Sequence, residues 1–168
     1  MQALIISDVH GDKQRFLDIL EANREADTII SLGDSELKRR LLEKHDVIAI
    51  KGNYPFDSGF TYEHVLKLDG RRTLLTHGHK HRIKHTYQQL YGRMLQEEAV
   101  LALHGHTHAP TMAEVAGRYI LNPGSASKSR SPDTPDSYLL LHFIEDGVVA
   151  RWYDAATHEP FREETLEI

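Results

Sequence analysis

The chain has 168 residues, of which 40% are hydrophobic and 27% charged, as is usual for a globular protein with a buried core. Its formal net charge of -5 argues against broad, nonspecific binding to nucleic acid, which needs a basic surface. There is no cysteine, which excludes disulfides and thiolate metal sites and leaves His, Asp, Glu and Asn as metal ligands.

Length and the N-terminal residues set expectations for organisation and location. We expect one domain spanning residues 1–168, because a chain of this length fits a single core. The first seven residues have no basic leader, and no apolar run approaches the roughly 18 residues that a membrane span needs. We therefore expect a cytoplasmic protein with no membrane partner.

Five short apolar runs in the first two thirds of the chain predict strands that are buried on both faces: ALIISD, TIISLGD, VIAIKGN, TLLTHGH and VLALHGH. Helical segments fit between several of them. Residues 12–24 show helical spacing, Ser35 is expected to cap a short helix that runs through Lys44, and the apolar residues of 83–95 are again spaced as in a helix.

The later part of the chain predicts β-hairpins. VLKLDGRRTLL, MAEVAGRYIL and LHFIEDGVVARW each place a small turn with a glycine between alternating flanks. Residues 123–137, rich in serine and proline, are expected to form a loop. A β-α-β opening followed by hairpins predicts an α/β sandwich of two mixed sheets with helices outside.

Polar side chains close the five apolar runs, and they are Asp8, Asp34, Asn53, His77 and His106. Ligands of α/β proteins gather beyond the carboxyl ends of strands, so these residues share one rim if the strands are parallel neighbours. Together with His10 and His108 they make seven metal-ligating side chains. One divalent ion takes about four to six ligands, so seven suit two ions that share a carboxylate such as Asp34. Taken alone, each has an ordinary alternative as a turn, cap or buried residue.

The order Asp-x-His, Gly-Asp, Gly-Asn, His-Gly-His and Gly-His-Thr-His resembles the calcineurin-like metallophosphoesterase superfamily. It is most similar to the small single-domain bacterial and archaeal phosphodiesterase branch, which also gave rise to a retromer coat subunit. LNPGSAS, at residues 121–127, matches a further signature of that branch, and the resemblance spans residues 8–130. It implies a four-layer α/β/β/α sandwich with the metal site at the C-terminal rim of the strands.

The resemblance also implies a role for each ligand. One ion would be held by Asp8, His10 and His108, the other by Asn53, His77 and His106, with Asp34 bridging the two. Mn²⁺ is the expected metal, with iron, nickel and zinc as alternatives. A hydroxide that bridges the ions would attack the phosphorus of a small phosphodiester substrate. The branch also implies a small homo-oligomer, a dimer or a tetramer.

The identity of the general acid is open. Phosphatases and nucleases of the superfamily have a histidine after the metal-binding asparagine, where this chain has Tyr54. The small branch commonly has an acidic residue one position later, where this chain has Pro55, with Asp57 two further along. His79 is our candidate for the acid or a phosphate contact, with a structural role as the alternative, and His104 is expected to be structural.

We expect a binuclear metal-dependent phosphodiesterase. The alternatives are a phosphomonoesterase acting on nucleotides or phosphoproteins, and a non-catalytic interaction module on the same fold. The basic residues Lys80, Arg82 and Lys84 are expected in a solvated loop and helix start, with a local phosphate-binding edge as the alternative.

Overall fold

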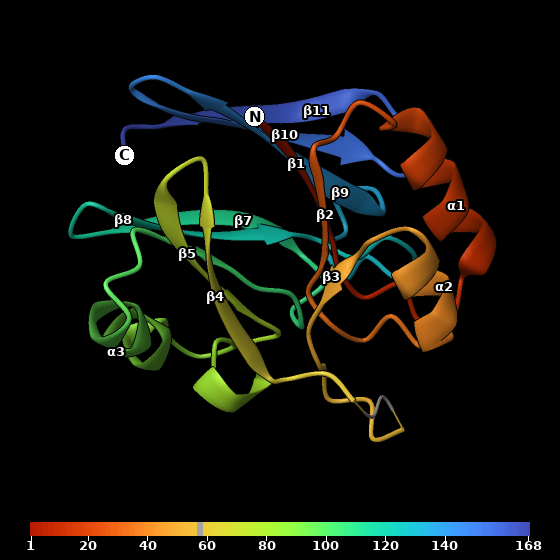
Figure 1. The fold of residues 1–168 in the computed structure, drawn as a ribbon, viewed down its shortest axis with the longest axis horizontal. Helices are drawn as coiled ribbons and strands as arrows, with labels where there is room; N and C mark the ends of the chain where they lie inside the picture. The colour runs from red at the N-terminus through yellow and green to blue at the C-terminus, as the bar shows by residue number, and fades with distance from the viewer. Residues whose placement is uncertain (57–58) are drawn as a thin grey trace.

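The structure is a computed structural model that describes residues 1–56 and 59–168. Two β-sheets face each other and helices cover their outer faces (Figure 1). Six strands form one sheet in the order β11-β10-β9-β1-β2-β3, and five form the other in the order β4-β5-β6-β8-β7. The elements are β1 (Gln2–Ile6), α1 (Lys13–Ala22), β2 (Thr28–Ser31), α2 (Arg39–Lys44), β3 (Ile48–Ala49), β4 (Glu63–Leu68), β5 (Arg71–Thr76), the 3₁₀ helix η1 (His79–His81), α3 (Gln88–Gln96), β6 (Leu101–Leu103), β7 (Pro110–Val115), β8 (Arg118–Pro123), β9 (Ser137–Ile144), β10 (Gly147–Asp154) and β11 (Pro160–Leu166).

Alternation along β1 shows how the layers pack. Ala3 and Ile5 lie in a core cluster between the two sheets, to which both sheets contribute. Leu4 and Ile6 point the other way and pack with Phe16 of α1 in a second cluster. The strand is therefore buried on both faces, as its continuous apolar run predicts.

The outer face of the five-stranded sheet is covered by α3. Leu90 and Met94 of this helix pack on Leu74 of β5 and Ala102 of β6 in a third cluster. With α1 and α2 on the opposite outer face, the order of layers is helix, sheet, sheet, helix. The predicted four-layer α/β/β/α sandwich with two mixed sheets is confirmed.

Parallel pairing is confined to the strands that precede the predicted ligands and to one further neighbour. β1 pairs in parallel with β2 and β2 with β3, while in the other sheet β6 lies between β5 and β8 and is parallel to both. The predicted hairpins β4–β5, β7–β8 and β9–β10 are antiparallel. The five apolar runs thus divide between two sheets instead of lying side by side in one. Their carboxyl ends meet where the two sheets face each other.

Two helix boundaries differ from the prediction. The helix expected from Ser35 begins only at Arg39, and the Ser35 hydroxyl accepts a long bond of 3.4 Å from the Leu37 N–H without capping α2. The cause is a contact between loops, because the Gly11 N–H donates to the Ser35 carbonyl at 2.9 Å, and Glu36 has φ in the left-handed region, which a helix cannot include. The helix expected over 83–95 is α3, which starts at Gln88 after a 3₁₀ turn.

No helix in the described ranges is long and apolar enough to cross a membrane.

Candidate metal centre

All seven side chains predicted as ligands lie in short loops after the carboxyl ends of strands. Four follow strands of the six-stranded sheet, and they are Asp8, His10, Asp34 and Asn53. The other three follow strands of the five-stranded sheet, and they are His77, His106 and His108. The two sheets together therefore supply the candidate centre, and neither holds it alone.

Backbone strain is concentrated at these residues. Five of the seven have φ in the left-handed region, and they are Asp8 (53°), His10 (48°), Asp34 (47°), His106 (67°) and His108 (59°). This conformation costs a residue with a Cβ about 1–2 kcal/mol and persists only where the surroundings impose it. Such strain is typical of functional sites, where it aims a side chain that an ordinary turn would direct elsewhere.

Two glycines allow the loops to approach each other closely. A Cβ on Gly52 would overlap the Asp34 carboxylate, and a Cβ on Gly105 would overlap the Ser7 hydroxyl and approach the Asp8 carboxylate. Neither position tolerates a side chain without a shift of the loop. Gly52 and Gly105 are therefore required because carboxylates pack directly against the backbone at these two positions.

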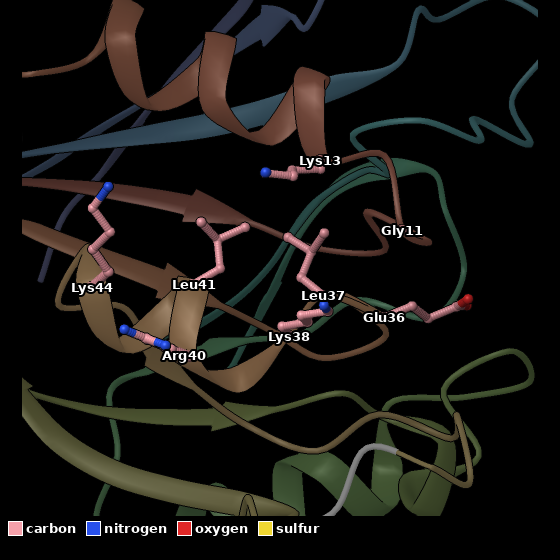
Figure 2. A pocket seen from close by; sticks show the side chains of 8 residues that line it. All are labelled: Gly11, Lys13, Glu36, Leu37, Lys38, Arg40, Leu41 and Lys44. Carbon is pink, nitrogen blue, oxygen red and sulfur yellow. The ribbon is translucent and has the colours of Figure 1, made fainter.

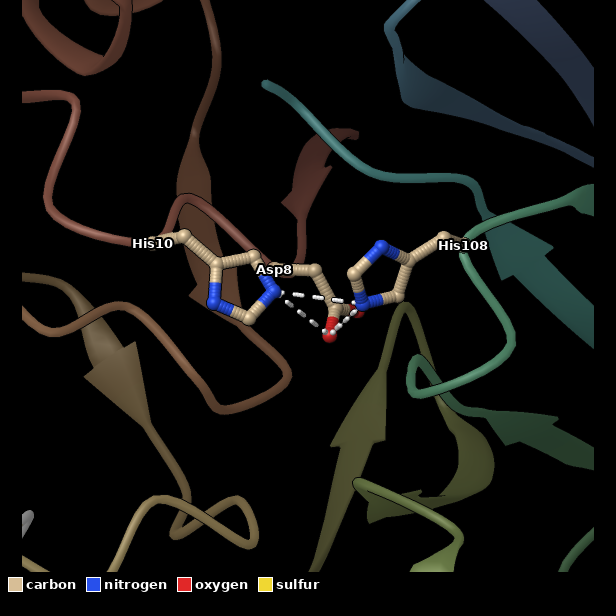
Figure 3. Close-up of side chains that lie close together, drawn as sticks. All are labelled: Asp8, His10 and His108. Atoms are coloured by element: carbon tan, nitrogen blue, oxygen red, sulfur yellow. Dashed lines mark hydrogen bonds and ion pairs between the residues drawn. The ribbon is translucent and has the colours of Figure 1, made fainter. Parts of the chain in front are cut away.

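One cluster joins Asp8, His10 and His108 (Figure 3). Asp8 Oδ1 lies 3.0 Å from His108 Nε2 and 3.7 Å from His10 Nε2, and the two imidazole Nε2 atoms are 3.2 Å apart. Asp8 and His108 are buried, and His10 is partly exposed. Three ligand atoms thus converge on one point from β1 and β6.

A second cluster is centred on His77. Its Nε2 lies 3.1 Å from Asn53 Oδ1, 3.5 Å from Asp34 Oδ2 and 3.9 Å from Asp8 Oδ1. The ring of His106 is 5.1 Å from that of His77 between centroids. Asp8 therefore belongs to both clusters, and it lies between two positions that could each hold a cation.

Hydrogen bonds outside the clusters fix how three imidazoles face inward. In each of them Nδ1 lies 2.7 Å from an oxygen that can only accept a hydrogen bond. The acceptor is the Glu36 carboxylate for His10, the Leu32 carbonyl for His77 and the Lys128 carbonyl for His108. Each Nδ1 must therefore carry the proton. In the neutral ring each Nε2 then presents a lone pair to the cluster, the arrangement found around bound metals.

This geometry fits a metal ion. Asp8 is fully buried, and its Oδ1 accepts no hydrogen bond from the described part of the chain. Facing it at 3.0–3.7 Å are the two Nε2 atoms whose lone pairs also point inward. A buried carboxylate oxygen and two nitrogen lone pairs repel one another unless a cation lies between them. A divalent ion with nitrogen and oxygen ligands meets this need.

The pKa values of the cluster also indicate a demand for positive charge. Burial raises the pKa of Asp8, but the contact with His108 and the charge of His77 outweigh it, so this pKa lies below its ordinary value. Burial also raises the pKa of Asp34, but the contact with His77 outweighs burial and lowers this pKa to about 2. The pKa of His77 is raised despite burial, because both carboxylates favour its charged form. The two carboxylates therefore favour a positive charge at this position.

His79 lies at the edge of the second cluster. Its ring centroid is 5.5 Å from that of His77 and 5.6 Å from that of Tyr62, and its Nδ1 is buried with no partner among the described residues. Burial and the charge of His77 lower the pKa of His79. The acidic alternative, Asp57, lies outside the described residues. His104 is fully buried at a strand end, as expected for a structural histidine.

The LNPGSAS segment holds two of the ligand loops together, a role that the sequence did not indicate. The Ser125 hydroxyl donates to the Asp8 carbonyl at 2.7 Å. Asn122 Nδ2 donates to the Gly105 carbonyl at 2.9 Å and to the Thr107 hydroxyl at 2.8 Å. Asn122 and Ser125 thus contact the loops that carry both clusters. Ser7 and Glu36 were also missed, although Ser7 donates to Asp8 Oδ2 at 2.6 Å.

Comparison with known proteins identifies the family. The model of the calcineurin-like phosphoesterase superfamily domain matches residues 1–146. The chain belongs to this superfamily. Membership indicates a hydrolase that acts on phosphoesters and uses divalent metal ions, which confirms the resemblance seen in the ligand motifs.

Relatives and solved structures agree with this assignment. The chain is 36% identical over 160 residues to a probable metallophosphoesterase of Bacillus subtilis, YsnB, covering 95% of this chain and 94% of the relative. It is 29% identical over 173 residues to the Escherichia coli phosphodiesterase YfcE, covering 84% and 87%. A predicted phosphoesterase from Streptococcus pneumoniae superposes with a TM-score of 0.88 at 26% identity, covering 98% and 97%. Vps29 of Entamoeba histolytica, solved with Zn²⁺, has a TM-score of 0.76 at 26% identity, covering 99% of both chains.

Proposed function

We propose that this member of the superfamily is a binuclear metal-dependent phosphodiesterase. The observation that carries the proposal is the pair of ligand clusters that share the buried, unpartnered Asp8 Oδ1. One ion would be held by Asp8, His10 and His108, and the other by Asn53, His77 and His106. The bridging role of Asp34 stays a prediction, and the position of Asp8 in both clusters supports a share in that role for Asp8.

The chain's own residues would organise the reaction around the ions. When bound, two divalent ions supply hydroxide near neutral pH and neutralise charge on the phosphoryl oxygens. Glu36, Leu32 and Lys128 hold the imidazoles in the orientation that presents Nε2. Ordered loops of this kind reduce the reorganisation that binding and reaction would otherwise require.

A small basic cavity of about 190 Å³ next to the second cluster supports a place for the substrate phosphoryl group or its leaving group. It is lined by His79, Arg82, Ile83, Lys84, His85 and His106. His106 belongs to the proposed ligand set and His79 is the candidate acid or phosphate contact. The cavity therefore favours the local phosphate-binding edge over a purely solvated loop for Arg82 and Lys84.

Two observations support a diester as the substrate. The similar YfcE is a phosphodiesterase. Tyr54 replaces the histidine that assists the leaving group in phosphatases of the superfamily, and its N–H donates to Asp34 Oδ1 at 2.8 Å. Mn²⁺ is the metal we propose, with zinc, iron and nickel as alternatives that suit the same nitrogen and oxygen ligands. A cytoplasmic location and a small homo-oligomer stay predictions.

The test is hydrolysis of a matched pair of esters, bis(4-nitrophenyl) phosphate and 4-nitrophenyl phosphate. Chelator-treated protein is assayed as Mn²⁺ is added. We expect activity to return with the metal and to favour the diester. A preference for the monoester would support the phosphomonoesterase instead. Tight metal binding with no hydrolysis of either ester would support an interaction module, the alternative that the similarity to Vps29 fits.

A further inference from the structure

A larger cavity of about 500 Å³ lies between the N-terminal turn of α1 and α2 (Figure 2). Leu37 and Leu41 point from α2 and the loop before it toward the part of α1 that carries Lys13. Four cations line the cavity, and they are Lys13, Lys38, Arg40 and Lys44. The cavity thus has an apolar middle and a basic margin.

The positive charge of this cavity exceeds the negative charge of its carboxylates. Glu36, which accepts from His10 Nδ1 at 2.7 Å, supplies one negative charge against four positive ones, and Glu43 of α2 pairs with Arg39 at 2.7 Å. Within the described residues, none of the four cations is in an ion pair. Arg40 and Lys44 are one helical turn apart, a spacing at which like charges destabilise a helix. Although the chain has a net charge of -5, this local concentration of cations would attract an anionic ligand.

The cavity adjoins the candidate metal centre, because Glu36, which lines it, lies 2.7 Å from His10 Nδ1. The loops after β1 and β2 run side by side, because the His10 N–H donates to the Asp34 carbonyl at 3.0 Å and the Gly11 N–H to the Ser35 carbonyl at 2.9 Å. These loops present ligands on one side and contribute Gly11 and Glu36 to the cavity on the other. A substrate with its scissile phosphate at the metals could therefore extend into the cavity past His10.

We propose that this cavity binds a second phosphate group of the substrate, so that the natural substrate is a phosphodiester carrying a further phosphate. The inference rests on the proposed function and specifies its substrate class. Arg40 and the lysines would form charge-assisted hydrogen bonds with the second phosphate. Leu37 and Leu41 would contact the uncharged part of the molecule that separates the two phosphates.

The test compares thymidine 5′-(4-nitrophenyl phosphate) with the same ester carrying a 3′-phosphate, using the Mn²⁺-loaded protein. We expect the 3′-phosphate to lower KM roughly tenfold, the factor that one charge-assisted hydrogen bond supplies. In Arg40→Glu and Lys13→Glu this preference should disappear. Lys67→Glu is the matched control, since it makes the same charge change at an exposed position of β4 in the other sheet, and it should keep the preference.

A second measurement separates this inference from the proposed function. Calorimetry of metal-free protein with thymidine 3′,5′-bisphosphate and with thymidine 5′-phosphate should show tighter binding of the bisphosphate, lost in Arg40→Glu. Equal KM values for the two esters, or equal affinities for the two nucleotides, would overturn the proposed cavity function. The same holds if Arg40→Glu and Lys67→Glu behave alike. Absence of hydrolysis with preferential binding of the bisphosphate would contradict the proposed function and leave the cavity assignment standing.

Discussion

Asp8 presents a buried, unpartnered carboxylate oxygen to both clusters. It is fully buried, and Oδ1 accepts no hydrogen bond from the described part of the chain, while Oδ2 is satisfied by Ser7 and by the His106 N–H at 3.0 Å. The neighbouring imidazoles favour the ionised form of this carboxyl, which makes it an anionic ligand for a cation. Metal affinity should therefore depend strongly on Asp8.

The variant Asp8→Asn tests this expectation because it removes the charge with almost no change of volume. We expect Mn²⁺ affinity to fall by at least about 100-fold, because a charged ligand is lost. Calorimetric titration measures the affinity. Asp18→Asn, at an exposed position of α1, should leave it unchanged. Unchanged affinity in Asp8→Asn would exclude this carboxylate as a ligand.

His104 should make the metal-free protein sensitive to acid. The side chain is fully buried, and burial lowers its pKa to about 4. Below the ordinary pKa of about 6.5 the unfolded chain takes up a proton on this residue that the folded chain does not. The free energy of unfolding should therefore be highest above that pH and fall as the pH drops toward about 4.

Urea denaturation of metal-free protein at several pH values between 7 and 5 measures this dependence. The variant His104→Gln cannot titrate in that range, so its free energy of unfolding should fall less steeply with acid than that of the wild type. Equal slopes for the two proteins would mean that His104 does not titrate in the predicted way.

At the scale of elements, the loops that follow the strands set the geometry of the centre. Gly52 illustrates this, because any Cβ there overlaps the Asp34 carboxylate and the loop must move. In contrast, a Cβ on Gly92 of α3 meets no atom within 4 Å. The two glycines therefore give opposite expectations for the same substitution.

We expect Gly52→Ala to lower stability by about 1–3 kcal/mol through overpacking and to weaken Mn²⁺ binding at least tenfold, on the order of the effect of disturbed ligand support. Gly92→Ala should raise stability by about 0.5–1 kcal/mol and leave metal binding intact. Urea denaturation and metal titration report both quantities. A Gly52→Ala protein that binds metal as well as Gly92→Ala would show that the close approach is not needed.

The strand ends could be predicted from sequence because each strand that is buried on both faces is apolar until it leaves the sheet. Asp8 and His77 are conspicuous for that reason, since each follows a run of buried residues. The same local pattern cannot show which strands share a sheet, so the division of the five runs between two sheets was not anticipated. The sequence does not predict the edge strand β11 either, because its polar residues are exposed or half-buried and it has no continuous apolar run.

Contacts between distant loops account for the remaining differences. Glu36 orients His10 from 26 positions away, and nothing in the residues around Glu36 indicates that hydrogen bond. The late start of α2 has the same origin, because the bond between Gly11 and Ser35 overrides the local preference of a serine for a helix cap. The family motif predicted which ligands meet, and the tertiary structure alone shows what holds them.

At the scale of the whole molecule, the candidate centre joins the two sheets. Asp8 and Asp34 come from the six-stranded sheet, and His77 and His108 from the five-stranded sheet. A metal ion bound to both sets of ligands would link the sheets across the central core. Binding to the folded state alone stabilises it by mass action.

We therefore expect Mn²⁺ to raise the melting temperature. At a metal concentration about 100 times the Kd, each site should add about 2.7 kcal/mol to the free energy of unfolding. Calorimetric melting with Mn²⁺ and after treatment with chelator measures the difference, and Asp8→Asn serves as the control that should lose it. Identical melting curves with and without the metal would argue against a centre that joins the sheets.

The most direct test of the central claim is a stepwise titration of metal-free protein with Mn²⁺, in which bound metal and hydrolysis of bis(4-nitrophenyl) phosphate are measured at every step. Two clusters that share Asp8 predict two ions per chain and activity that reaches its maximum only when the second site fills. Full activity after one equivalent, or two tightly bound ions without hydrolysis, would contradict a binuclear phosphodiesterase.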